Sequence, residues 1–154
     1  GLATVELPGR FQIVAGQPVL VLDVAHNPQA AATLAFNLDQ MGFYPRTHAV
    51  FGVMRDKDIA GVVGKLGNRI DHWHVGPTPG SRGTSAAQIG SQLRATGVGT
   101  ASGQSITEYS TLADAYAAAR DSASADDRIV AFGSFLTVSG VLQAIDDERK
   151  RRTT

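Results

Sequence analysis

The 154-residue sequence has no cysteine, no net charge and no hydrophobic run long enough to cross a membrane. The lack of cysteine excludes disulfide scaffolds, thiolate zinc sites and thiol nucleophiles. With 14 basic and 14 acidic residues, the charge balance gives no reason to expect a nucleic acid or an anionic membrane as partner. Together with a start that lacks a signal-peptide layout, these absences predict a soluble cytoplasmic protein.

Three motifs of self-sufficient enzymes are also missing. The segment 61–66 (GVVGKL) lacks the spacing and the hydroxyl residue of a P-loop, and no G-x-G-x-x-G motif opens a helix. Gly133 and Ser134 are followed by Phe135 and Leu136, without the second glycine of a nucleophile elbow. The sequence therefore disfavours an autonomous NTPase, a dehydrogenase and a serine hydrolase.

The length and the hydrophobic pattern predict one α/β domain over residues 1–154. Four apolar runs are typical of strands buried on both faces of a parallel sheet: 19–22, 48–54, 70–75 and 129–132. Helical spacing of apolar residues follows each run and also marks a helix that begins after Thr111. The segment 97–105, rich in glycine, serine and threonine, has the weakest signal, and no strand is assigned to it.

This alternation of strands and helices predicts a three-layer, Rossmann-like fold. We expect a mostly parallel sheet of about six strands with helices on both faces. The short run 11–14 precedes Gly16 and Pro18 and is expected to pair with the strand that begins at Val19, which supplies one antiparallel edge strand or hairpin. The start at Gly1 rather than at Met leads us to expect a piece of a longer protein.

Polar residues stand where the predicted strands end. Because the carboxyl ends of parallel strands share one edge of a sheet, these residues are expected to converge, although some are more than a hundred positions apart. The pattern does not decide whether Arg10, which precedes the first strand, lies at the same edge or at the opposite one. The remaining candidates are Asp23, His26, Asn27, Lys57, Arg82 and Ser134.

Each candidate also has a purely structural interpretation. Asp23 forms a turn or accepts hydrogen bonds from ribose hydroxyls. His26 is a loop histidine bonded to the backbone, or a group that orients an amine and removes its proton. Ser134 caps a helix, and that same position suits a carboxylate or phosphate. Arg10 and Lys57 are more often surface charges than ligands.

His72 and His74 lie on the same face of a predicted strand, on either side of Trp73. Two histidines without a third nearby ligand favour packing over a metal site. We therefore predict no metal site in this chain.

Four segments together resemble the C-terminal domain of folylpolyglutamate synthase/dihydrofolate synthase, a relative of the Mur ligases. The segments are LPGRFQ (7–12), LDVAHNP (22–28), FGVMRDKD (51–58) and FGSFLTVSGVL (132–142). The resemblance spans essentially the whole chain, with the segments in order and with compatible gaps. Val24 departs from it, because the family usually has glycine after the aspartate.

The resemblance implies a domain of an ATP-dependent amide ligase, in which L-glutamate joins a folate or dihydropteroate carboxylate through an acyl phosphate. It implies that ATP and Mg²⁺ are held mainly by an N-terminal P-loop domain that this chain lacks, so that the chain alone is catalytically incomplete. By similarity, Arg10 contacts the γ-phosphate, Asp23 holds the ribose, and His26 and Ser134 bind the incoming glutamate. Weaker candidates for anion or substrate contacts are Asn27, Lys57 and Arg82.

Two alternatives remain open at this point. The first is the C-terminal domain of a Mur peptidoglycan ligase, although the GSF and DKD segments favour folate. The second is a stand-alone flavodoxin-like binding or interaction module, for which Arg10, Asp23 and His26 would be dispensable.

Overall fold

Six strands form one sheet in the computed structural model, which describes residues 10–152. They lie in the order β1-β2-β6-β3-β4-β5; β1 runs antiparallel to β2, and the other neighbours are parallel. The strands are β1 (Gln12–Val14), β2 (Val19–Asp23), β3 (Thr47–Phe51), β4 (His72–Val75), β5 (Ser105–Glu108) and β6 (Arg128–Phe132). The predicted parallel sheet with an opening hairpin is therefore confirmed. Residues 7–9 of the LPGRFQ segment lie outside the described residues.

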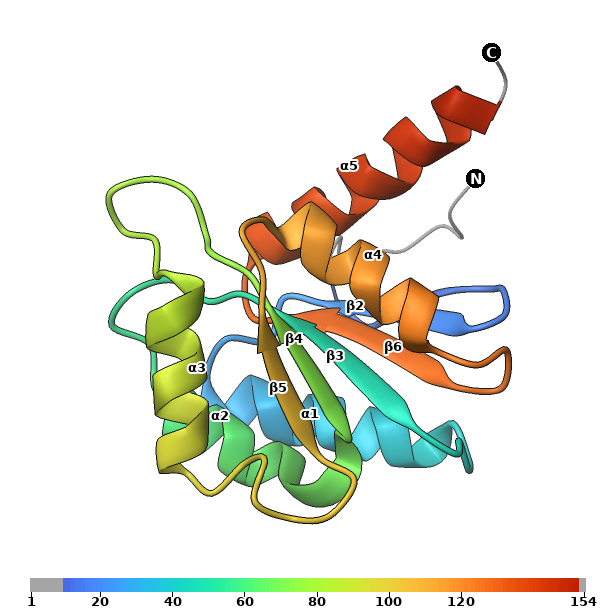
Figure 1. Cartoon of the computed structure of the whole chain (residues 1–154). Coiled ribbons are helices and arrows are strands. Elements are labelled where there is room, and N and C mark those ends of the chain that lie inside the picture. Colours follow the sequence, from blue (N-terminus) through green and yellow to red (C-terminus); the bar gives the residue numbers. More distant parts are fainter. Residues whose placement is uncertain (1–9, 153–154) are drawn as a thin grey trace.

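Helices cover both faces of this sheet (Figure 1). On one face lie α1 (Pro28–Gln40), α2 (Ile59–Leu66) and α3 (Ala86–Ala95), with the short 3₁₀ turn η1 (Gly67–Arg69) after α2. On the other face lie α4 (Leu112–Ser122) and α5 (Phe135–Arg152). The predicted three-layer architecture is confirmed.

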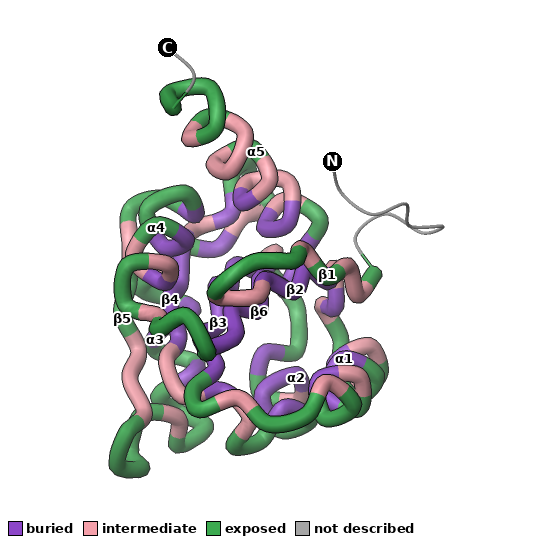
Figure 2. The backbone as a smooth tube through the Cα atoms, turned by 90° about the vertical axis from the view of Figure 1, so that its right-hand side faces the viewer, coloured by how far each residue is buried: buried purple, intermediate pink, exposed green. Residues whose placement is uncertain are grey.

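The period-two pattern of the strands separates two hydrophobic cores. In β2, Val21 packs toward α1, α2 and α3, while Leu20 and Leu22 pack toward α4 and α5. The other parallel strands divide in the same way, so that the central strands are buried along their length and the helices on one side only (Figure 2). Continuous apolar runs in the sequence thus correspond to strands with two dry faces.

The structure corrects several element boundaries. The chain leaves the sheet at Phe51, three residues before the predicted end of that strand, and β4 begins two residues later than predicted. The edge strand β5 begins at Ser105, where the unassigned segment ends. Its residues are half-buried or exposed, so apolar and polar residues do not alternate along it. The charged C-terminal tail is helical as far as Arg152. Trp73 is buried in the core.

The order of the strands creates a crevice at the carboxyl edge. β6 returns across the sheet to lie between β2 and β3. The chain leaves β2 for α1 on one face, whereas it leaves the neighbouring β6 for α5 on the other face. Two adjacent parallel strands whose connections leave in opposite directions form a topological switch point, where open α/β sheets bind ligands.

The buried Arg128 fixes the far end of α1. Its Nη1 donates to the Leu38 carbonyl at 2.8 Å, and its Nε donates to Thr47 Oγ1 at 3.1 Å. Its guanidinium also lies 4.8 Å from the centre of the Tyr44 ring. A cation that bonds the last carbonyls of a helix is favoured there by the helix dipole. This anchor holds the helix that forms one wall of the site described below.

A chain of hydrogen bonds crosses the sheet beneath α4. Tyr109 Oη lies 3.0 Å from His74 Nδ1, His74 Nε2 lies 3.2 Å from His48 Nδ1, and His48 Nε2 lies 3.4 Å from Asp127 Oδ2. The Asp127 carboxylate accepts, and each neutral histidine donates from one ring nitrogen and accepts at the other. Every hydrogen bond in this chain therefore donates in the direction from Tyr109 toward Asp127. His74 is therefore packed as predicted, but within a polar chain that joins distant parts of the sequence, and His72 on the same strand is half-buried.

Acid is expected to destabilise the chain through this pair of histidines. Burial lowers the pKa of His74 from 6.5 to about 4, and burial also lowers the pKa of His48. The unfolded chain therefore binds more protons below about pH 6.5, so that stability is highest above that pH and falls toward pH 4. Urea denaturation at a series of pH values should show a smaller loss in His74→Gln. His72→Gln removes only a minor cause of the two lowered pKa values and should keep most of the loss seen in the wild type. An equal loss in all three proteins would contradict this account.

None of the helices in the described part of the chain combines the length and the apolar character that crossing a bilayer demands.

Candidate functional site

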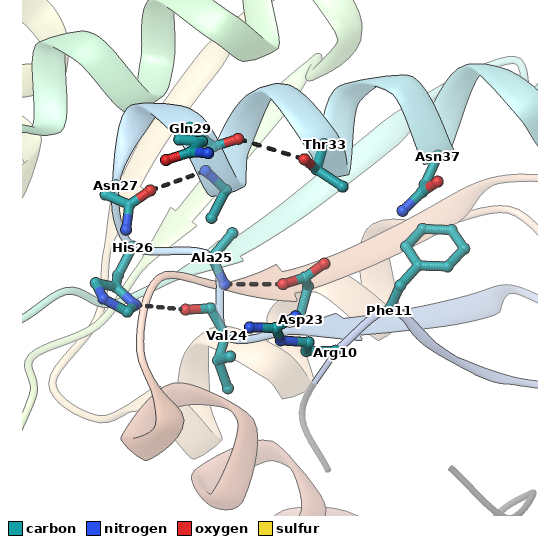
Figure 3. A pocket seen from close by; sticks show the side chains of 11 residues that line it. Arg10, Phe11, Asp23, Val24, Ala25, His26, Asn27, Gln29, Thr33 and Asn37 are labelled. Atoms are coloured by element: carbon teal, nitrogen blue, oxygen red, sulfur yellow. Dashed lines mark hydrogen bonds between the residues drawn. The ribbon is translucent and has the colours of Figure 1, made fainter. Parts of the chain in front are cut away.

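A pocket of about 450 Å³ opens at the carboxyl end of β2, between β1 and α1 (Figure 3). It lies beside the switch point and therefore where the fold favours a ligand. Its lining consists of Arg10, Phe11, Asp23, Val24, Ala25, His26, Asn27, Gln29, Ala30, Thr33 and Asn37.

Asp23 is the buried acid of this pocket. It is the last residue of β2 and is 9% exposed. Its Oδ1 accepts a hydrogen bond from the Ala25 N–H at 2.9 Å. Burial raises the pKa of Asp23, while the N–H groups of Ala25 and Phe11 and the charge of Arg10 oppose that rise. A carboxylate held by backbone donors on one side can accept further hydrogen bonds from a ligand on the other.

Arg10 lies at the same edge as Asp23, which settles the question that the sequence left open. The antiparallel register pairs Gln12 with Leu22, so the chain before β1 runs alongside the chain after β2. The exposed Arg10 and the buried Asp23 line the same pocket and interact electrostatically. Between Arg10 and β1, Phe11 has a φ of +35°, which L-residues adopt at a cost of about 1–3 kcal/mol. The turn at Phe11 lies where the chain passes from Arg10, at the pocket, into β1.

His26 presents one free ring nitrogen. Its Nδ1 lies 2.9 Å from the Val24 carbonyl oxygen, which can only accept, so Nδ1 carries the proton. In the neutral ring Nε2 is then the basic atom. The half-buried ring is thus bonded to the backbone, as the structural interpretation predicts, and still offers an acceptor for a proton.

The side chain of Asn27 caps the N-terminus of α1. Its Oδ1 accepts from the Ala30 N–H at 2.8 Å, and Pro28 occupies the first turn of α1. The cap directs the N-terminus of α1 toward the pocket.

Ser134 follows the neighbouring strand but does not line the pocket. The register pairs Asp23 with Phe132, so Ser134 begins the connection on the far side of the switch point from His26. Its Oγ accepts from the Thr137 N–H at 3.1 Å, in the manner of a helix N-cap. Asp23, at the end of β2, and Ser134, just after the end of the adjacent β6, therefore lie at the same edge of the sheet, as predicted.

Lys57 and Arg82 lie farther along this edge, in the loops after β3 and β4, and neither lines the pocket. Both are exposed. The two loops are joined by a 2.7 Å hydrogen bond from the Arg55 N–H to the Arg82 carbonyl. The structure thus gathers Arg10, Asp23 and His26, and leaves these two cations outside the cavity.

Among the lining residues that the sequence did not single out, three are polar and one is aromatic. Gln29, Thr33 and Asn37 recur every four residues along α1 and form a polar stripe on its pocket side. The four-residue spacing is visible in the sequence, but the sequence does not show that this side of α1 faces a pocket. Phe11 was missed because only its backbone conformation distinguishes it; its ring lies with Asn37 at the end of the pocket away from His26 (Figure 3).

Within residues 10–152, no three His, Asp or Glu side chains gather in a way that would hold a metal ion. Arg10 and Asp23 suit a nucleotide instead, because a planar fork of donors fits phosphoryl oxygens and a carboxylate fits sugar hydroxyls.

Comparison with known proteins agrees with this geometry. The family described as "Mur ligase, glutamate ligase domain" matches residues 9–135. The dihydrofolate synthase/folylpolyglutamate synthase of Escherichia coli is 39% identical over 97% of the chain, and its Buchnera aphidicola counterpart (from Acyrthosiphon pisum) is 34% identical over 92%. The chain spans about a third of the length of these relatives: 33% and 32%.

Solved structures of the same enzymes resemble this chain in fold. Escherichia coli FolC in complex with ADP, without folate substrate, matches 94% of this chain and 33% of its own, with a TM-score of 0.81 and 38% identity. A bifunctional folylpolyglutamate synthase/dihydrofolate synthase with Mn, AMPPNP and L-glutamate bound matches 92% of this chain and 32% of its own, with a TM-score of 0.78 and 40% identity. The chain therefore belongs to the glutamate ligase domain family of the Mur ligases, and its relatives there are folylpolyglutamate and dihydrofolate synthases.

Proposed function

We propose that this chain is the C-terminal domain of an ATP-dependent ligase that joins L-glutamate to a folate or dihydropteroate carboxylate. One observation carries the proposal: Arg10 and Asp23 line one pocket beside the switch point of a chain whose relatives are folate ligases. Two of its structural neighbours were solved with ADP, or with AMPPNP, Mn and L-glutamate. These ligands match the chemistry that the pocket offers.

In this proposal Arg10 acts on the phosphoryl group. The folate carboxylate oxygen attacks the γ-phosphorus of ATP, ADP leaves, and an acyl phosphate forms. The guanidinium of Arg10 neutralises charge on the transferred phosphoryl oxygens, where preorganised donors have their largest effect. Asp23 accepts hydrogen bonds from the ribose and so fixes the nucleotide next to Arg10.

The second step uses the other side of the switch point. The amine of L-glutamate attacks the acyl carbon, the C–N bond forms, and phosphate leaves. The ammonium must lose a proton first, and the free Nε2 of His26 is the acceptor we propose for it. Ser134, at the N-terminus of α5, orients the amino acid. Lys57 and Arg82 are positioned only for weaker contacts with its carboxylates.

In this proposal, part of the reaction depends on a domain outside this chain. A P-loop domain preceding it would hold Mg²⁺ and most of the ATP, and this domain would close over them. We therefore propose that the chain acts in the cytoplasm as part of a longer enzyme and is inactive when separated.

Asp23→Asn tests the ribose contact in that longer enzyme. The variant keeps the shape of the side chain but loses the charged acceptor, which should raise the KM for ATP about 10- to 100-fold. The wild type should discriminate against 2′-deoxy-ATP or 3′-deoxy-ATP, and the variant should lose that discrimination. Asp126→Asn, at an exposed position at the opposite edge, is the control. Equal discrimination in wild type and Asp23→Asn would overturn the assignment.

A further inference from the structure

Two buried hydroxyls and one strand carbonyl form a short hydrogen-bonded chain next to the switch point. Thr137 Oγ1 donates to the Gly52 carbonyl at 2.7 Å, and it lies 3.1 Å from Ser134 Oγ. Ser134 Oγ also accepts from the Thr137 N–H at 3.1 Å. Thr137 is fully buried and Ser134 is 5% exposed. This chain ties the start of α5 to the end of β3.

The hydroxyl protons in this chain have only one consistent arrangement. A carbonyl oxygen can only accept, so the single hydroxyl proton of Thr137 goes to Gly52. Thr137 Oγ1 can then serve its contact with Ser134 only as an acceptor. The hydroxyl proton of Ser134 consequently points inward, to Thr137. Ser134 has no proton left for a ligand, but it retains a lone pair.

We infer that Thr137 sets Ser134 as a hydrogen-bond acceptor, so that Ser134 receives an N–H of the incoming amino acid rather than donating to one of its carboxylates. Thr137 is in this sense a positioning residue, because it acts on the substrate only through Ser134. The inference rests on the proposed function and deepens it. It assigns Ser134 the same end of glutamate as His26, whose free Nε2 accepts from the same amine across the switch point.

Close packing surrounds this hydrogen-bonded chain. A Cβ added to Gly52 would lie 3.0 Å from Thr137 Oγ1 and 2.9 Å from Leu112 Cδ2, so the start of α5, the end of β3 and the start of α4 are in close contact. The buried side chain of Thr137 is therefore closely packed beside its acceptor, the Gly52 carbonyl.

Glutarate tests the inference, because it has both carboxylates of glutamate and lacks the amine. In the longer enzyme, Ser134→Ala should raise the KM for glutamate about tenfold and leave the inhibition constant of glutarate unchanged. Thr137→Ser keeps the hydroxyl and should behave as wild type in both measurements. Thr137→Val, if circular dichroism shows it folded, should raise the KM for glutamate as Ser134→Ala does. Ser139→Ala, one turn farther along α5, is the control.

Each result decides the question. If Ser134→Ala weakens glutarate and glutamate equally, Ser134 donates to a carboxylate and the inference is wrong. If it changes neither, Ser134 only caps α5, and the inference is equally wrong. A folded Thr137→Val with wild-type KM would remove Thr137 from the account. Failure of the proposed function has a separate signature, since the wild type would then show no saturation by glutamate.

Discussion

Replacing Arg10 by alanine is expected to lower kcat of the longer enzyme about 100- to 1,000-fold, the usual cost of removing a donor aimed at developing charge. The exposed Arg10 lines the same pocket as the buried Asp23, and its charge acts on that carboxyl group. Arg10→Lys restores the charge without the planar fork and should recover only part of the rate.

Three comparisons make the Arg10 prediction specific. Binding of ADP should be nearly unchanged in Arg10→Ala, because the proposed contact is with the γ-phosphate. Arg46→Ala, an exposed arginine at the amino edge of the sheet, should keep the wild-type rate. A rate for Arg10→Ala within about twofold of the wild type would show that phosphoryl transfer does not depend on this domain's arginine.

The second large effect is expected on folding. Gly133 has a φ of +118°, and a Cβ placed there would overlap the Gly52 carbonyl oxygen and lie 2.9 Å from the Phe51 ring. Gly133→Ala therefore combines backbone strain with overpacking, and urea denaturation should show a loss of about 3 kcal/mol or more. The strand end that leads into Ser134 is the part of the chain that must shift.

Gly64→Ala is the matched control for that loss. Gly64 lies within α2, and a Cβ there would meet no other atom within 4 Å. The same chemical change should stabilise the protein by about 0.5–1 kcal/mol, because alanine is the better helix residue. If both substitutions changed the stability equally, the close contact between the ends of β3 and β6 would not be the reason for a glycine at position 133.

The sequence predicted those features that depend on neighbours along the chain. The apolar run before Asp23, the cap at Asn27 and the proline after it define a strand, a loop and a helix within ten residues. The local sequence pattern therefore located the part of the site that follows β2. The same reasoning failed for β5, because an edge strand with two half-buried and two exposed residues has no apolar period to detect.

The remaining features depend on contacts between distant segments. Arg10 was assigned to the correct edge only when the antiparallel register of β1 was known. His48 contacts Asp127, 79 positions away, so the polar chain beneath α4 had no local signature. The contact of Thr137 with Gly52 spans 85 positions for the same reason. Periodicity reports which side of an element is buried, but not which residue it meets.

The central claim is that this chain completes an ATP-driven glutamate ligase. Incorporation of radiolabelled L-glutamate into dihydropteroate or folate, measured together with ADP release, tests it most directly. The account predicts equal amounts of ADP and glutamyl product from the longer enzyme and none from the 154-residue chain alone. Glutamyl product from the separate chain, or ADP release by the longer enzyme without product, would contradict it.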